Sequence, residues 1–249
     1  MMIFFKKKLS KIAILMAFSQ VFFFPSTGHG KDFKIAVQKG FYPTLLQLRS
    51  KIEDSLRVQV KIVAINHPLI EDHLQKNAEG IDLIIFNDNG ISEKLEKKGY
   101  LLQGTTTKFV TSEFSFWCPA SKVNMRLTIV DTLKNLKDSK IALPSQSTPA
   151  FQAFKEYLPH ISNDSNVYYV DSNLESWRLA SLGRVDCALT FKSLLKENQR
   201  DRMRVLPNYF VQMSLAIPSG ASELRASQQA LKLMTSPIWQ AKMRLLGYD

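Results

Sequence analysis

Residues 140–158, KIALPSQSTPAFQAFKEYL, combine the signals of a buried strand and of a helix start. The apolar run KIAL is typical of a short strand, and a polar turn follows it. Thr148-Pro149-Ala150 then marks the beginning of a helix, because proline is favoured at the first helical position. The turn has neither the lysine of a P-loop nor the glycines of a dinucleotide-binding loop. The stretch therefore predicts a strand–helix unit with a bare helix N-terminus.

The same alternation extends in both directions along the chain. We expect strands at 33–37, 58–65, 81–86, 114–119, 140–144, 166–170, 185–191 and 210–218. We expect helices around Leu45–Ile52 and at 69–77, 91–101, 131–136, 149–158, 175–184 and, as one long last helix, 222–247. Continuous apolar strands that alternate with helices predict a mainly parallel sheet covered on both faces.

The rhythm breaks at 114–119 and again near 210–218, which divides the pattern into two blocks. We predict an α/β fold with two lobes, each a mostly parallel sheet flanked by helices, joined by two hinge strands. The expected boundaries are a signal peptide at 1–30, lobe 1 at 31–113 plus 212–249, and lobe 2 at 114–211. A ligand would bind in the cleft between the lobes, beyond the carboxyl ends of the strands.

The N-terminal thirty residues have the pattern of a secretory signal. A lysine-rich start, with Lys6 to Lys8 and Lys11, precedes an apolar run over 12–24 that is too short to span a membrane. Small residues favour cleavage after Gly30, although a cut after Gly28 and an uncleaved anchor remain open. There is no cysteine near the predicted cleavage site, which argues against a lipid anchor. No later apolar stretch is long enough to span a membrane. We therefore predict a soluble protein exported to the periplasm.

Charge and cysteines narrow the classes of partner. The net charge of +11 falls to +7 without the four lysines of the predicted signal. Basic residues are scattered rather than clustered with aromatic ones, which argues against nucleic-acid binding and is compatible with small anions. Cys118 and Cys187 are the only cysteines. Export permits a disulfide between them, but two buried free thiols are the simpler interpretation.

Several stretches, in this order and spacing, resemble the molybdate-binding family of periplasmic substrate-binding proteins of ABC transporters. They are IDLIIFNDNGISEKLEKKGYL (81–101), IALPSQSTPAFQAFKEYL (141–158), LASLGRVDCALTFKSLL (179–195) and LMTSPIWQAKMRLLGY (233–248). The resemblance covers 33–248. It implies a type 2 periplasmic-binding-protein fold, monomeric, that closes on a tetrahedral oxyanion and delivers it to an inner-membrane permease. It implies no cofactor, no metal and no catalytic residue.

The resemblance also indicates where the ligand would bind. Such proteins hold the oxyanion with backbone N–H groups and hydroxyls, often at helix N-termini. The matching positions here are Lys39, Gly40, Asn66, His67, Ala150, Asn173 and Phe191. An ordinary turn with a proline start remains the alternative for Ala150.

This chain departs from the pattern of that family at three hydroxyl positions. Gly40 stands where the family has serine, Asn66-His67 replaces a glycine-serine pair, and Phe191 replaces a tyrosine. Each lost charge-assisted hydrogen bond costs about 1.5–3 kcal/mol. We therefore expect tight molybdate binding to be lost unless Lys39, Asn66 or His67 compensates.

The same residues allow other functions. Phe41, Tyr42 or Trp177 in the cleft would suit an organic ligand, and a degenerate copy of the fold could instead contact another protein. His67 and His73 are spaced six apart, on different helix faces, which disfavours a metal site. No nucleophile, acid and base converge in the pattern, so we do not expect an enzyme. Asp186, at the start of a strand, is expected to be structural.

Overall fold

The strand–helix alternation becomes one continuous sheet in the computed structural model, which describes residues 32–66, 69–76, 80–88, 90–119, 127–136, 138–161 and 166–249. The predicted signal peptide and His67 lie outside the described residues. The eight strands run in the spatial order β2-β1-β3-β8-β4-β7-β5-β6. Their bounds are β1 Phe33–Gln38, β2 Val60–Ile65, β3 Leu83–Asn87, β4 Thr107–Trp117, β5 Ile141–Pro144, β6 Val167–Val170, β7 Cys187–Phe191 and β8 Met203–Ala216.

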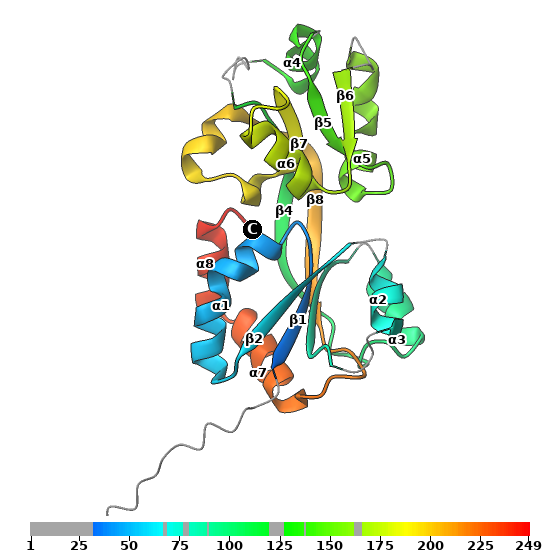
Figure 1. Cartoon of the computed structure of the whole chain (residues 1–249), viewed down its shortest axis with the longest axis vertical. Coiled ribbons are helices and arrows are strands. Elements are labelled where there is room, and N and C mark those ends of the chain that lie inside the picture. Colours follow the sequence, from blue (N-terminus) through cyan, green and yellow to red (C-terminus); the bar gives the residue numbers. More distant parts are fainter. Residues whose placement is uncertain are drawn as a thin grey trace, which may run out of the picture. The chain divides into compact units, whose positions relative to one another are not determined.

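The strands at both ends of this sheet pair in parallel. Strand β1 pairs in parallel with β2 and β3, and β5 does so with β6 and β7. Between them, β8 and β4 pair antiparallel with each other and with their outer neighbours. Figure 1 shows these two long strands running from one parallel region to the other. The predicted fold class is confirmed, and the lobe boundaries stay a prediction.

Both crossing strands begin earlier than predicted. Polar residues interrupt the apolar pattern in the first part of β4, where the register shifts between Lys108 and Val110 and again between Glu113 and Ser115. In β8, Pro207 and Asn208 suggest a turn, and Asn208 has a φ of 62°. The strand continues through this irregularity because its partner β4 supplies the pairing.

Eight α-helices cover the described part of the sheet. They are α1 Tyr42–Leu56, α2 Ile70–Lys76, α3 Ile91–Lys97, α4 Ile129–Asn135, α5 Pro149–Phe154, α6 Asn173–Ser181, α7 Leu224–Met234 and α8 Pro237–Leu245. Short 3₁₀ turns occur at Lys155–His160, Lys192–Leu194 and Glu197–Arg202. At the β1–β3 end, α1, α7 and α8 lie on one side of the sheet and α2 and α3 on the other (Figure 1).

Two helix predictions are wrong at proline positions. The expected last helix is two helices, because Pro237 cannot continue α7 and instead begins α8. The Ser236 side chain caps α8 by accepting from the Trp239 N–H group. The expected helix over 149–158 is α5 followed by a 3₁₀ turn that contains Pro159.

The cysteines form a disulfide, so the interpretation as free thiols is wrong. Cys118 follows β4 and Cys187 begins β7, with their Cα atoms 4.2 Å apart. The β4–β7 register pairs Trp117 with Ala188, which places the two cysteines opposite each other. This proximity depends on pairing between strands distant in sequence, and the local pattern does not reveal it.

Candidate functional site

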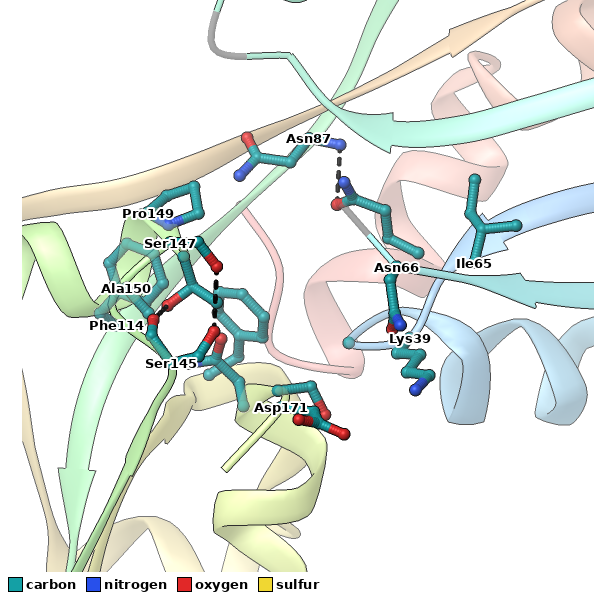
Figure 2. Close-up of a pocket in the computed structure, with 16 residues that line it drawn as sticks. Lys39, Ile65, Asn66, Asn87, Phe114, Ser145, Ser147, Pro149, Ala150 and Asp171 are labelled. Atoms are coloured by element: carbon teal, nitrogen blue, oxygen red, sulfur yellow. Dashed lines mark hydrogen bonds between the residues drawn. The ribbon is translucent and has the colours of Figure 1, made fainter. Parts of the chain in front are cut away.

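A cavity of about 330 Å³ lies at the carboxyl ends of the parallel strands, and both ends of the sheet contribute to it. Residues after β1, β2 and at the end of β3 form one side, and residues after β5 and β6 form the other. Figure 2 shows Lys39 and Asn66 on one side and Ser145, Ser147 and Asp171 on the other. Ligands of open α/β sheets bind at this edge.

Most of the predicted site residues come together in this one cavity. Its lining includes Lys39, Gly40, Asn66, Ala150, Asn173 and Phe191. The remaining predicted residue, His67, lies outside the described residues. The involvement of these residues in ligand binding stays a prediction.

Hydroxyl groups reach the cavity from positions that the sequence reasoning missed. Ser145 and Ser147, in the turn after β5, line the cavity with their Oγ atoms 3.1 Å apart. Ser172 lines it at the start of α6, where its Oγ atom accepts from the Glu175 N–H group. The three departures from the resembled family therefore do not leave the site without hydroxyls. The serines of the turn SQST were the available signal.

The turn also leaves a backbone donor at Ala150. Thr148 caps α5, since its Oγ1 atom accepts from the Phe151 N–H group at 3.2 Å and its carbonyl oxygen accepts from Gln152. Thr148 is itself held by donating to the carbonyl oxygen of Ser145 at 2.8 Å. The Ala150 N–H group, in the first turn, has no intrahelical partner. The predicted donor is thus geometrically available in the lining.

Three amide side chains in the lining are more than nine-tenths buried. Gln38, Asn87 and Asn173 expose 8%, 4% and 6% of their surface. The Oε1 atom of Gln38 accepts from the Asn87 N–H group at 2.9 Å. Gln38 Nε2, Asn87 Oδ1 and Asn173 Nδ2 have no hydrogen-bond partner among the described residues. Buried polar atoms are rarely left unpaired, but each of these three atoms exposes less than 1 Å² of surface, so a ligand in the cavity does not reach them in this conformation.

One side chain of each charge completes the polar lining. Lys39 follows β1, and Asp171 follows β6. Neither forms an ion pair within 4.0 Å with the other or with any other described residue. Sequence reasoning missed Asp171, together with Gln38 and Asn87. The signal for the amides was a polar residue at the end of an apolar strand, in FKIAVQ and LIIFN.

An aromatic pair forms the apolar part of the lining. The rings of Phe114 and Phe191 stack with centroids 5.1 Å apart. A Cβ atom at Gly40 would lie 2.6 Å from Phe191 Cε2, so a side chain at position 40 requires the ring to move. Phe41, Tyr42 and Trp177, the aromatic residues considered as an alternative lining of the cleft, do not line this cavity. Phe41 instead packs in the core against the rings of Phe109 and Tyr248.

The other residues considered for chemistry have structural partners. Asp186 accepts from the Lys140 N–H group at 2.9 Å, which confirms its structural role. Glu71 pairs with Lys94 and Lys98, and hydrogen bonds from these lysines lower the pKa of its carboxyl. Burial lowers the pKa of His73. Within the described ranges, His, Cys, Asp and Glu side chains form no group of three or more that could hold a metal.

None of the described helices has the length and apolar character needed to cross a membrane. No curated protein sequence matches the chain. Solved structures of the same fold do. The periplasmic molybdate-binding protein of Azotobacter vinelandii is 14% identical, with a TM-score of 0.71 over 88% of this chain and 99% of that one.

Two further structures of this fold were solved with organic acids. AgtB from A. tumefaciens R10, in complex with agropinic acid, is 12% identical with a TM-score of 0.70 over 87% of this chain and 82% of that one. PEB3 bound to L-phospholactate is 12% identical with a TM-score of 0.62 over 88% and 99%. These likenesses show the type 2 periplasmic-binding-protein fold. The family described as bacterial extracellular solute-binding protein, whose members are binding proteins and not enzymes, matches residues 33–249, and the chain belongs to it.

Proposed function

We propose that this protein is the periplasmic component of an ABC transporter and binds a small acid in the cavity between the two parallel regions. The observation that carries the proposal is the lining itself. It combines an unpaired lysine from one end of the sheet with serine hydroxyls from the other. Closure about β4 and β8 would surround the ligand before delivery to an inner-membrane permease.

Two features of the chain that are typical of exported proteins support a periplasmic location. The Cys118–Cys187 disulfide fits an oxidising compartment such as the periplasm. The basic and apolar N-terminal segment supplies a route there, with cleavage near Gly30. A monomer that meets its permease transiently is the assembly we expect.

An acidic group on the ligand follows from the donors in the lining. Lys39 offers a positive charge, and the Ala150 N–H group and the serine hydroxyls offer hydrogen bonds. The likeness to a molybdate-binding protein and to structures bound to agropinic acid or L-phospholactate supports the same class.

An organic acid fits this lining better than a bare oxyanion. The carboxylate of Asp171 would repel a doubly charged molybdate, with a strength that solvent reduces because Asp171 is exposed. The cavity of about 330 Å³ is at the lower end of the range for ligand pockets, and the Phe114–Phe191 stack offers an apolar contact.

Molybdate or tungstate is the second candidate, because Ser145 and Ser147 restore hydroxyl donors to the site. A degenerate copy without a ligand is disfavoured, since the cavity is not filled by side chains.

A thermal-shift series on residues 31–249 tests the proposal. The panel contains molybdate, tungstate, sulfate, phosphate, a phosphonate and small organic acids. A ligand at one hundred times its Kd adds about 2.7 kcal/mol, which raises the Tm by roughly 5–10 °C. The Lys39→Met variant should keep the unliganded Tm and lose the shift. A panel with no shift, or an undiminished shift in the variant, would contradict the proposal.

A further inference from the structure

Within the proposed function, on which this inference rests, we propose that the bound acid also carries an ammonium group. Lys39 would hold the acidic group and Asp171 the ammonium group, so the ligand is an amino-acid-like zwitterion.

The charges of the lining carry the argument. Lys39 and Asp171 are the two formally charged side chains among its described residues. They come from opposite ends of the sheet, after β1 and after β6, and they are more than 4.0 Å apart, since no ion pair joins them. A zwitterion would pair with both and leave the filled cavity neutral. A simple anion would leave the carboxylate of Asp171 unmatched beside it.

The neutral groups of the lining leave the choice of ligand to its charged groups. Side-chain amides carry both a donor and an acceptor, whereas an oxyanion needs donors alone. Here Asn87 and Asn173 are buried, and each has an atom without a partner among the described residues. The unpaired Asn173 atom is the donor Nδ2 and only the Asn87 atom, Oδ1, is an acceptor, so the exposed acceptor for which a bare oxyanion has no use is the carboxylate of Asp171.

Asp171 can be substituted without disturbing the fold. It is exposed, whereas the adjacent Ser172 makes the capping contact of α6. Replacing its carboxylate by an amide therefore removes the charge without removing a structural hydrogen bond that the described residues show. In Figure 2 the Asp171 side chain lies on the same side of the cavity as Ser145, across from Lys39 and Asn66.

Calorimetric titration with matched triads of ligands tests the inference. Each triad differs only in an ammonium, a hydroxyl or a hydrogen: alanine, lactate and propionate; aspartate, malate and succinate; 2-aminoethylphosphonate, 2-hydroxyethylphosphonate and ethylphosphonate. In at least one triad the amine should bind at least tenfold more tightly than its two analogues. A charge-assisted hydrogen bond is of that strength.

Two variants test whether Asp171 is responsible for the preference for the amine. Asp171→Asn should reduce the amine preference to less than threefold, because the amine loses its partner and the anionic analogues no longer face a carboxylate. Asp54→Asn, at an exposed position of α1 away from the cavity, is the matched control and should keep the preference.

Three results would overturn the inference. They are equal binding within every triad, a preference for the hydroxy acid, or an amine preference that survives in Asp171→Asn. If no member of any triad binds, the inference also fails. The proposed function fails as well if, in addition, no compound of the thermal-shift panel raises the Tm.

Discussion

The two parallel ends of the sheet use the same device to align their strands. Asp82 precedes β3 and accepts from the Lys34 N–H group of β1 at 2.9 Å. Asp186 precedes β7 and accepts from the Lys140 N–H group, next to β5, also at 2.9 Å. In each case an aspartate before one strand pairs with the backbone of its parallel neighbour.

The two aspartates differ in their burial and in the contacts that stabilise the structure around them. Asp82 is fully buried and also accepts from the N–H and hydroxyl groups of Ser222 and from the Glu223 N–H group, next to α7. Asp186 is partly exposed, and its end of the sheet carries the disulfide instead. The outer strand there, β6, leaves Tyr168 and Tyr169 about half exposed. The comparison teaches that a buried polar network ties down one end and a disulfide the other, whereas the main hydrophobic core extends to both.

Removing the disulfide should produce the largest loss of stability. The cysteines are separated by 69 residues, and closing a loop of that size stabilises the folded state by about 4 kcal/mol. We expect Cys118→Ala/Cys187→Ala to lower the free energy of unfolding by about that amount in urea titrations. Hydrogen exchange should increase mainly in β5 to β7.

Reduction of the wild-type protein is the control for this variant. It should reproduce the loss, and the same reagent should leave the double variant unchanged. A loss below about 1 kcal/mol, or faster exchange mainly in β1 to β3, would contradict the account.

The aspartate pair should respond unequally to truncation. Asp82→Ala leaves several buried donors unpaired and should cost about 3 kcal/mol, whereas Asp186→Ala should cost about 1 kcal/mol. Urea unfolding of the two single variants measures the difference, and each serves as the control of the other. Equal losses would mean that the surrounding network adds nothing to Asp82.

Tyr248 offers the smallest and most pH-dependent effect. Its hydroxyl lies 2.9 Å from Thr44 Oγ1, so Tyr248→Phe should cost about 1 kcal/mol at neutral pH. Burial raises the pKa of Tyr248 to about 12, above the value near 10 of an unfolded tyrosine. The folded state favours the protonated form, so this contribution is complete below pH 10 and is lost as the pH rises toward 12.

Unfolding free energies of wild type and Tyr248→Phe between pH 8 and 12 measure this dependence. The gap between the two proteins should narrow above pH 10. A gap that stays constant over the whole range would show that the tyrosine does not titrate in this way.

The sequence pattern sufficed for the fold class because buried parallel strands are continuously apolar. The runs IDLIIF and VDCALTF are recognisable without any tertiary information. The early parts of β4 and β8 are not, because their polar residues and Pro207-Asn208 are tolerated only through pairing with each other. The disulfide depends on the same kind of long-range register.

The candidate site was predictable where its position follows from the ends of strands. The resemblance to the molybdate-binding family indicated Lys39, Asn66 and Asn173 at such positions, and all three line the cavity. Asp171 and Ser147 were not predicted, since periodicity does not tell which polar residue of a turn faces a cavity. The charge of Asp171 is the basis of the proposed ligand class, so the missed residue matters more to the proposal than those that were predicted.

The most direct test of the account is a crystal structure of the protein with its tightest-binding acid. We predict a ligand in the cavity that contacts Lys39 from one end of the sheet and Asp171 or Ser145 from the other. A ligand bound elsewhere, or one held only by residues of a single end, would contradict the claim that the two parallel regions together form a solute site.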